Sequence, residues 1–256
     1  MIYITADIHG CYNEFMKLLK EIDLKDEDTL YILGDVIDRG PEPIKCLLYI
    51  MEHPNIKLIM GNHDEFLYNY LKLKEEGLTK SRIFLENREC WFRNGGEISL
   101  SQLSKESEET RDKVLEYLKQ VPYYVQLEDT LLVHAGIYPY ELGQEDLVKR
   151  QLEEDLIWIR NEFIQSEIKL PFKVIFGHTP TCNVLNSILS YNRFSRTKIE
   201  YQYEELQHIY FNNKIGIDGG CCFGGHLLAL RLDDMKHSTY SSSFDNSRNN
   251  LEEIQT

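Results

Sequence analysis

Two acids and an arginine lie close together in the segment 34–40. Asp35, Asp38 and Arg39 follow the apolar run 29–33, which predicts a buried strand bounded by glycine. Ligands of open α/β sheets bind where strands end, so these side chains stand at a place suited to chemistry. Carboxylates bind metal ions, and a guanidinium can hold two phosphate oxygens at once. A solvated turn is the alternative interpretation, because aspartate and glycine form turns readily.

Four of the eight histidines share one position relative to the predicted strands. Each follows an apolar run directly and lies in a turn with glycine or an acid: His9, His63, His134 and His178. A single histidine in such a turn is usually a hydrogen-bonded residue with a structural role. The same placement at four strand ends favours a shared site instead, because strand ends gather at one edge of a sheet.

Oxygen and nitrogen ligands suited to metal ions occupy these same turns. The candidate ligands are Asp7, His9, Asp35, Asn62, His134 and His178. Imidazole with carboxylate suits Mn, Fe or Zn. Six protein ligands are too many for one catalytic metal that keeps an open position, so two metals are the natural interpretation. Asp35 is then the candidate bridging carboxylate, and a metal pair of this kind binds a phosphoryl oxygen and activates water.

A repeated order of apolar strand, polar turn and helix positions these residues and predicts an α/β fold. The predicted strands are residues 1–6, 29–33, 56–60, 130–133, 172–176, 214–217 and 227–232. Between residues 65 and 120 the composition becomes charged, which predicts an insert with helices at 65–76 and 105–120. The turn-rich, aromatic segment 91–96 interrupts this insert, and a further helical stretch covers 144–163.

Length and composition favour one catalytic domain over residues 1–236. With 256 residues and 42% hydrophobic content, the chain can bury a sizeable core. The segment 237–256 is rich in serine and asparagine and lacks apolar residues for a core, which predicts a polar, disordered tail.

The charge of the chain argues against several classes of partner. Its formal net charge of −14 opposes a broad contact with nucleic acid or with an anionic membrane. No apolar run approaches the roughly 20 residues of a membrane-spanning helix. The six cysteines form no Cys-x-x-Cys pair, and the first residues resemble a strand and not a signal peptide, so a cytoplasmic location is expected. The oligomeric state is not predicted.

Five short motifs together resemble one enzyme family. DIHG, GDVIDRG, GNHD, HAG and GHTP occur in this order within residues 2–232. The series resembles the PPP family of metal-dependent phosphoprotein phosphatases, within the calcineurin-like metallophosphoesterases, and especially its small bacterial and phage members. Each motif alone is a weak signal, but the ordered set is specific. The resemblance implies a four-layer αββα sandwich of two mixed β-sheets flanked by helices.

The resemblance also implies a role for each candidate residue. Two divalent metals are expected, with Mn favoured and Fe or Zn as alternatives: one bound by Asp7, His9 and Asp35, the other by Asp35, Asn62, His134 and His178. His63 resembles the family's general acid for the leaving alcohol, oriented by Asp38. Arg39 resembles one phosphate clamp and Arg160 the second, although a single arginine in an acidic helix is often only an ion-pair partner.

The expected activity is hydrolysis of phosphoserine and phosphothreonine in proteins, with phosphotyrosine and phosphorylated small molecules as further candidate substrates. Metal-bound hydroxide would attack phosphorus directly, with no phosphoenzyme. The alternative is a symmetrical diadenosine tetraphosphate hydrolase, which uses the same scaffold and metals. Asp38 and the Trp-x-x-Asn-Gly-Gly segment that begins at Trp91 favour the protein phosphatase over this alternative.

Two further classes fit the sequence less well. Repair nucleases of the superfamily also carry GNHD, but they have a second histidine where this chain has Pro180. Asp64 stands where glutamate usually follows the histidine of the third motif, which puts a supporting contact in question. A catalytically inactive module that binds phosphoproteins would have lost at least one metal ligand, and none is missing.

Overall fold

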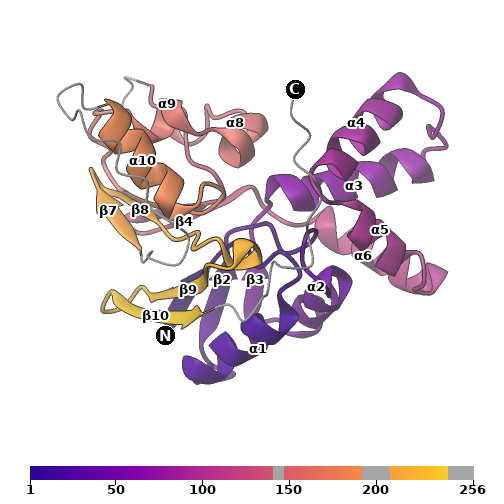
Figure 1. Cartoon of the computed structure of the whole chain (residues 1–256), viewed down its shortest axis with the longest axis horizontal. Helices are drawn as coiled ribbons and strands as arrows, with labels where there is room; N and C mark the ends of the chain where they lie inside the picture. The colour runs from indigo at the N-terminus through magenta and orange to yellow at the C-terminus, as the bar shows by residue number, and fades with distance from the viewer. Residues whose placement is uncertain (141–146, 192–207, 242–256) are drawn as a thin grey trace.

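Two mixed β-sheets pack face to face in the computed structural model, which describes residues 1–140, 147–191 and 208–241 (Figure 1). The first sheet contains, in spatial order, β10 (Lys236–Ser241), β9 (His226–Arg231), β1 (Ile2–Thr5), β2 (Thr29–Ile32) and β3 (Ile56–Leu58). The second contains β4 (Tyr124–Leu127), β5 (Thr130–Val133), β6 (Lys173–Phe176), β8 (Lys214–Gly216) and β7 (Ile209–Phe211). Each sheet has three parallel strands, β1, β2 and β3 in the first and β5, β6 and β8 in the second.

Alternate residues of the central strands lie in different hydrophobic layers, because side chains of a strand point to opposite faces. In β2, Leu30 and Ile32 belong to the layer beneath the helices, whereas Tyr31 belongs to the layer between the sheets. In β6, Ile175 packs in that same inner layer, and Val174 lies on the outer face of the second sheet. Three hydrophobic layers therefore separate four layers of secondary structure.

Helices cover both outer faces of the pair of sheets. The first sheet carries α1 (Tyr12–Glu21) and α2 (Pro43–Glu52), and Figure 1 shows α8 (Glu153–Trp158), α9 (Asn161–Ile164) and α10 (Thr181–Tyr191) gathered over the second. Phe15 of α1 and Leu47 of α2 are fully buried against the first sheet, and Phe163 of α9 is fully buried against the second. The predicted four-layer αββα sandwich is confirmed.

The charged stretch after β3 folds into four helices where the sequence predicted two. They are α3 (Asn62–Glu75), α4 (Arg82–Arg93), α5 (Glu97–Leu103) and α6 (Glu108–Leu118), and they gather at one side of the molecule (Figure 1). Ser81 caps α4 by accepting a hydrogen bond from Phe84 N–H at 3.2 Å. The predicted interruption at 91–96 is wrong for residues 91–93, which lie inside α4, and the break between α4 and α5 is confined to residues 94–96. Only Phe84 and Trp91 of α4 are buried, whereas Ile83 and Leu85 of the same helix are exposed.

The predicted polar tail begins later than the sequence suggested. Residues 237–241 form most of β10, which pairs with β9 from Lys236 opposite Arg231 to Ser241 opposite His226. An edge strand is held by backbone hydrogen bonds and does not need an apolar run, which is why composition misled the prediction. The remainder, 242–256, lies outside the described residues, as do residues 144–146 of the predicted helical stretch 144–163.

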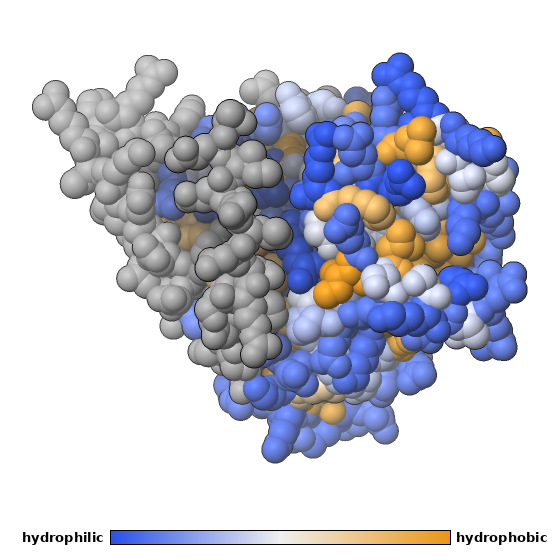
Figure 2. Space-filling model, turned by 45° about the vertical axis from the view of Figure 1, so that its right-hand side comes forward, coloured by the Kyte–Doolittle hydropathy of each residue, from blue (hydrophilic) through white to orange (hydrophobic). Residues whose placement is uncertain are grey.

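The surface mixes hydrophilic and hydrophobic residues. On the face shown in Figure 2, hydrophobic residues form small patches among hydrophilic ones over the part of the chain that the structure describes. Scattered apolar residues of this kind are normal on protein surfaces. Among the described residues, none of the helices has the length and apolar composition needed to cross a membrane.

Candidate metal centre

The polar loops that follow β1, β2, β3, β5 and β6 meet at one edge of the two sheets. His9 N–H donates to the Asp35 carbonyl oxygen at 2.9 Å, which joins the loops after β1 and β2. His178 N–H lies 3.0 and 3.1 Å from the two carboxylate oxygens of Asp7, which joins the second sheet to the first. The structure therefore brings together turns that are far apart in the sequence.

The backbone of this edge has an unusual conformation. Among the described residues, ten other than glycine have positive φ angles, and six of them are candidate site residues: Asp7, His9, Asp35, Asp38, Arg39 and His178. A left-handed conformation costs energy for residues with a Cβ atom, and such residues cluster at functional sites. The sharp turns aim side chains from successive loops toward a common centre.

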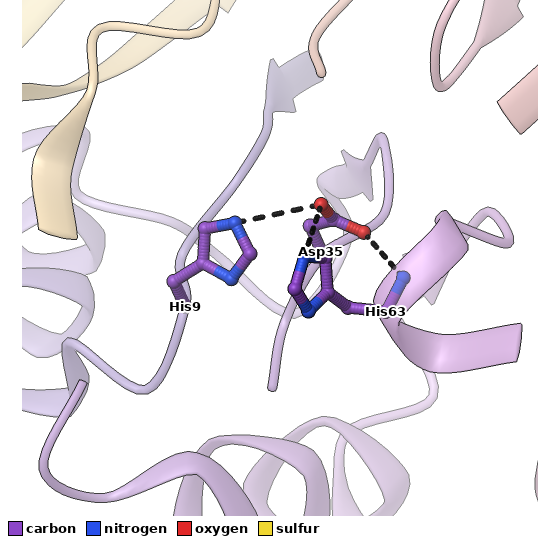
Figure 3. Close-up of side chains that lie close together, drawn as sticks. All are labelled: His9, Asp35 and His63. Carbon is purple, nitrogen blue, oxygen red and sulfur yellow. Dashed lines mark hydrogen bonds and ion pairs between the residues drawn. The ribbon is translucent and has the colours of Figure 1, made fainter. Parts of the chain in front are cut away.

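Asp35 occupies the middle of this centre, and its two carboxylate oxygens face different histidines. Oδ2 lies 3.4 Å from His9 Nε2 and 3.9 Å from His63 Nε2, as Figure 3 shows. Oδ1 lies 3.4 Å from His134 Nε2 and accepts a hydrogen bond from His63 N–H at 3.0 Å. Ligand atoms of His9, Asp35 and His63 form one cluster, and those of Asp35, His134 and His178 form another, each within 4.8 Å. One carboxylate is thus shared by two clusters, as a bridging ligand requires.

Two histidines are held with their lone pairs directed into the centre. The Nδ1 of His9 lies 2.8 Å from the Ile37 carbonyl oxygen, and the Nδ1 of His134 lies 2.6 Å from that of Leu33. A carbonyl oxygen can only accept, so each Nδ1 carries the hydrogen and each Nε2 is left with a lone pair. Burial lowers the pKa of His9 well below its usual value and also lowers the pKa of His134, which keeps both rings neutral. Neutral imidazoles fixed in this way are ready metal ligands.

Three polar atoms converge on the second-sheet side of the centre. His134 Nε2 lies 3.0 Å from Asn62 Oδ1 and 3.2 Å from His178 Nδ1. Burial lowers the pKa of His178 well below its usual value, so this ring is neutral as well. His178 Nε2 is buried and has no hydrogen-bond partner among the described residues. Imidazole nitrogens and an amide oxygen beside the Asp35 carboxylate form a ligand set that fits a divalent metal.

Buried carboxylates give the centre an excess of negative charge. Burial, together with the carboxylates of Asp218 and Asp35, raises the pKa of Asp7 well above its usual range, and burial raises the pKa of Asp218 to about 6. Burial alone would raise the pKa of Asp35, but the surrounding imidazoles, when they are protonated, outweigh this and hold the pKa below its usual value. Clustered buried carboxylates are stabilised by bound cations. His and Asp groups able to bind metal ions are therefore present, and they fit the expected metals.

The clusters of ligand atoms include His63 and leave out Asp7, whereas the family resemblance implied that Asp7 is a ligand and His63 is not. Asp7 lies beside the centre, but within the described residues it belongs to neither cluster of ligand atoms, and its oxygens face His178 N–H. His63 instead has its Nε2 in the cluster of His9 and Asp35. Coordination by Asp7 remains a prediction, and His63 stands close enough to act on anything bound there.

His63 is paired with Asp38, as the sequence predicted. His63 Nδ1 lies 2.6 Å from Asp38 Oδ2, and both side chains are almost completely buried. The pairing fixes the ring so that Nε2 faces the centre, where a proton could be given to a leaving group.

Both predicted phosphate clamps reach the centre. Arg39 Nη1 donates to His9 Nε2 at 2.5 Å, and the Arg39 guanidinium lies 5.3 Å from the centre of the Phe223 ring. Arg160 Nη1 donates to the His178 carbonyl oxygen at 3.1 Å and to Thr179 Oγ1 at 2.9 Å. The helical stretch breaks between α8 and α9 at Arg160, which stays exposed while its guanidinium contacts the loop that carries His178.

Comparison with known proteins gives the same class of site. The family model described as calcineurin-like phosphoesterase matches residues 1–228. The chain belongs to the calcineurin-like phosphoesterase family. A bis(5'-nucleosyl)-tetraphosphatase PrpE, of the asymmetrical kind, from Anoxybacillus flavithermus is 26% identical over 92% of this chain and 92% of its own. A symmetrical bis(5'-nucleosyl)-tetraphosphatase from Vibrio parahaemolyticus is 24% identical over 91% of this chain and 95% of its own.

A solved structure shares the fold of this phosphoesterase. It is a crystal structure provisionally assigned as a diadenosine tetraphosphatase, with a TM-score of 0.61 and 23% identity. The match covers 94% of this chain and 93% of the other. Both sheets and the helical insert therefore fall within a known arrangement.

The aspartate that replaces the usual glutamate in this phosphoesterase still makes the supporting contacts. Asp64 Oδ2 accepts hydrogen bonds from Asp35 N–H at 2.7 Å and Gly61 N–H at 3.2 Å, and Oδ1 accepts one from Val36 N–H at 3.2 Å. Asp64 is fully buried. The shorter side chain thus holds the loop that carries Asp35, and the contact that the sequence put in question is present.

Three polar residues near the centre were not predicted as site residues. Asp218 follows β8 and is 4% exposed, and the signal that found the other candidates, a polar residue just after an apolar strand, applies to it as well. Trp91 Nε1–H and Ser99 Oγ–H both donate to the Asp38 carboxylate. No sequence pattern reveals these two contacts, because they depend on how the insert packs.

Proposed function

We propose that this phosphoesterase hydrolyses bis(5'-nucleosyl) tetraphosphates. The observation that carries the proposal is that relatives matching more than nine-tenths of the chain bear that name. The alternative expected from the sequence is thus better supported than the protein phosphatase. The PrpE relative is of the asymmetrical kind and the Vibrio relative of the symmetrical kind, so the position of cleavage is left to experiment.

The two features that favoured a protein phosphatase do not discriminate between substrates. Asp38 pairs with His63, and Trp91 donates to Asp38 at 2.7 Å. Both residues therefore support one proton-transfer group, and any phosphoryl substrate can use such a group. Their presence is compatible with either substrate.

Each nearby residue has a task suited to hydrolysis of a phosphoanhydride. His9, Asp35, Asn62, His134 and His178, with Asp7 beside them, would hold two divalent metals, which when bound polarise phosphoryl oxygens and activate water. Arg39 and Arg160 present guanidinium groups to the non-bridging oxygens of the phosphate chain. His63 Nε2, with its ring held by Asp38, supplies a proton to the bridging oxygen that leaves.

An aromatic side chain lies beside one of these cations. The ring of Phe223 is 39% exposed, and Arg39 lies over it. A nucleobase stacks on aromatic rings and on guanidinium planes, so a phosphate held by Arg39 would bring its nucleoside toward this ring. A dinucleotide can use such a ring, whereas a phosphorylated serine has no base to place there.

The test is to incubate the enzyme and Mn²⁺ with diadenosine tetraphosphate and, separately, with a phosphothreonine peptide, each with a chelator control. We expect chelator-sensitive cleavage of the dinucleotide at a kcat/KM well above that of the peptide. Water added at the central anhydride gives two ADP, and water added at an outer anhydride gives ATP and AMP, so nucleotide chromatography identifies the cleaved bond. Faster phosphate release from the peptide would contradict the proposal and restore the protein phosphatase.

A further inference from the structure

We propose that Trp91 and Ser99, both from the helical insert, are positioning residues that hold Asp38 and thereby orient His63 for proton transfer. This inference rests on the role of His63 in the proposed function. Neither residue faces the ligand clusters directly, and both act through the carboxylate of Asp38. The insert would then be part of the catalytic apparatus and not only a covering of the sheet.

Trp91 and His63 bind the same oxygen of Asp38. Trp91 is 0% exposed, and its Nε1–H donates to Asp38 Oδ2 at 2.7 Å, while His63 Nδ1 lies 2.6 Å from that oxygen. An indole N–H can only donate, so Trp91 needs a hydrogen-bond acceptor at this point, and Asp38 Oδ2 provides it. The indole therefore fixes the oxygen that sets the tilt of the His63 ring.

Ser99 holds Asp38 at two points. Its hydroxyl donates to Asp38 Oδ1, and its oxygen accepts from the Asp38 backbone N–H at 2.9 Å. Asp38 has a φ angle of 71°, in the left-handed region that is unfavourable for residues with a Cβ atom. Ser99 thus holds the strained backbone and the far carboxylate oxygen together, and with Trp91 it leaves the carboxylate little freedom to rotate.

Gly95 and Gly96, which lie between Trp91 and Ser99, let the chain pass close to the Trp91 indole and to Arg39. Gly96 has a φ angle of −73°, which any residue tolerates, but a Cβ atom there would overlap the Trp91 indole. Gly95 has a φ angle of 93°, and its carbonyl oxygen lies 3.4 Å from the Arg39 N–H. The segment therefore passes close under the indole and reaches the residue next to Asp38. Alanine at Gly96 should displace the indole without straining the backbone.

A purely structural role for Trp91 would involve only its ring. The ring packs on Tyr70 with centroids 5.5 Å apart, and Phe84 of the same helix packs on Tyr70 at 5.1 Å. Both aromatic residues are buried, but only Trp91 donates to Asp38. Phe84 therefore provides a matched control for packing in the same helix.

The experiment compares two aryl phosphates that differ in leaving group. Nitrophenolate leaves without a proton, whereas phenolate needs protonation, so loss of a general acid slows phenyl phosphate far more than p-nitrophenyl phosphate. Values of kcat and KM, together with bound Mn²⁺, would be measured for Trp91→Phe, Ser99→Ala, Ser99→Thr and Gly96→Ala. Phe84→Leu serves as the packing control, and His63→Asn reports complete loss of the acid.

We expect kcat for phenyl phosphate to fall about tenfold or more in Trp91→Phe, Ser99→Ala and Gly96→Ala, since small misplacement of a catalytic group is costly. The kcat for p-nitrophenyl phosphate should fall less than about threefold, and KM and bound Mn²⁺ should stay near wild type. Ser99→Thr keeps the hydroxyl and should keep most of the activity, and Phe84→Leu should show no preference between the substrates.

Equal losses with both substrates, an unchanged Trp91→Phe enzyme, or the same preference in Phe84→Leu would each overturn the inference. If Trp91→Phe does not fold, Ser99→Ala and Gly96→Ala decide it in the same way. If His63→Asn itself slows both substrates equally, the acid role of His63 fails, and with it the proposed mechanism. A different outcome refutes only the role of Trp91 and Ser99: His63→Asn slows phenyl phosphate more than p-nitrophenyl phosphate, but the variants of the insert slow both substrates equally.

Discussion

Asp35 is shared by two clusters: the first-sheet cluster of His9, Asp35 and His63, and the second-sheet cluster of Asp35, His134 and His178. The two clusters differ in which protein groups face the ring nitrogens of their histidines. On the second-sheet side, Asn62 Oδ1, His134 Nε2 and His178 Nδ1 converge, and Arg160 donates to the His178 carbonyl oxygen and not to the ring. On the first-sheet side, Arg39 Nη1 donates directly to His9 Nε2. Within the described parts of the chain, no guanidinium donates to a ring nitrogen on the second-sheet side, so a cation can bind there without displacing an arginine. The first-sheet side needs Arg39 to move.

This difference indicates how the centre fills. The second-sheet cluster, where no arginine or lysine of the described segments donates to a ligand nitrogen, should take the first metal. The first-sheet cluster should take the second metal as Arg39 turns from His9 toward a phosphate. Arg39 would then respond both to the metal and to the substrate, whereas Arg160, anchored at Thr179, would keep its place.

The largest effect should come from the residue that both clusters share. Asp35→Asn removes the charge that faces His9 and His134, and activity should fall more than about a thousandfold, because loss of metal catalysis removes several kcal/mol of transition-state stabilisation. The loss is measured as the rate of phosphate release and as the amount of bound Mn²⁺. Asp23→Asn is the matched control, since Asp23 also has a positive φ angle but its carboxylate is exposed and pairs with Lys25. If Asp35→Asn still bound Mn²⁺ and kept its activity, Asp35 would not be a ligand shared by the two clusters.

Single-ligand variants on the two sides should separate the clusters. His178→Ala should weaken the first Mn²⁺ equivalent by about a hundredfold or more, since even changes to residues that only support a ligand cost ten- to a hundredfold. His9→Ala should weaken the second equivalent and leave the first near wild type. Isothermal titration of the metal-free protein with Mn²⁺ resolves the two steps. Identical losses of both equivalents in the two variants would show that the clusters are not independent.

Arg39→Ala tests the competition on the first-sheet side. Without the guanidinium at His9 Nε2, the second Mn²⁺ equivalent should bind more tightly. KM for a phosphorylated substrate should rise about tenfold, because a charge-assisted hydrogen bond contributes about 1.5–3 kcal/mol. The affinity for the second Mn²⁺, measured by titration calorimetry, should therefore rise, while the higher KM shows weaker use of the substrate. Weaker binding of both metal and substrate would contradict the competition.

Phe223→Ala tests whether the first-sheet side also receives the nucleoside. KM for diadenosine tetraphosphate should rise about fivefold, since loss of one base stack costs about 1 kcal/mol at the lower end of its range. KM for p-nitrophenyl phosphate should stay the same, because this substrate has no base. Phe223→Trp should restore the affinity for the dinucleotide. An equal rise with both substrates would assign Phe223 to packing around Arg39.

The smallest effect should appear in the pH dependence of stability without metal. Burial lowers the pKa of His178 well below 6.5, so between its folded pKa and 6.5 the unfolded state binds more protons. The contribution of His178 to the free energy of unfolding is therefore present above pH 6.5 and is lost as the pH falls. Asp7 and Asp218, whose pKa values are raised, act in the opposite direction. Melting curves of the metal-free protein should thus show a shallower decline below pH 6.5 for His178→Asn than for wild type, and equal slopes would contradict this.

Much of the fold and of the centre was predictable because the signals are local. An apolar run followed by a polar, glycine-bounded turn identified His9, Asp35, His134 and His178, and the structure brings all four to one edge. Asp218 satisfies the same rule but was not predicted as a site residue. The short edge strands β4, β7 and β10 escaped prediction, because their backbone hydrogen bonds, and not an apolar pattern, define them. Helix α4 also escaped prediction, although its N-cap Ser81 is a local signal.

The sequence by itself determined which side chains stand at strand ends, and the resemblance of its motifs to a known family implied a phosphoesterase with metal-binding groups. Only the tertiary structure decided which groups contact one another. The two carboxylate oxygens of Asp35 face two different clusters, and Arg39 donates to His9. Trp91 and Ser99 donate to Asp38 although they lie 53 and 61 residues away in the sequence. The physical reason is range. Side-chain periodicity and turn chemistry act over a few residues, whereas a shared carboxylate or a buried hydrogen bond depends on which distant segments pack together.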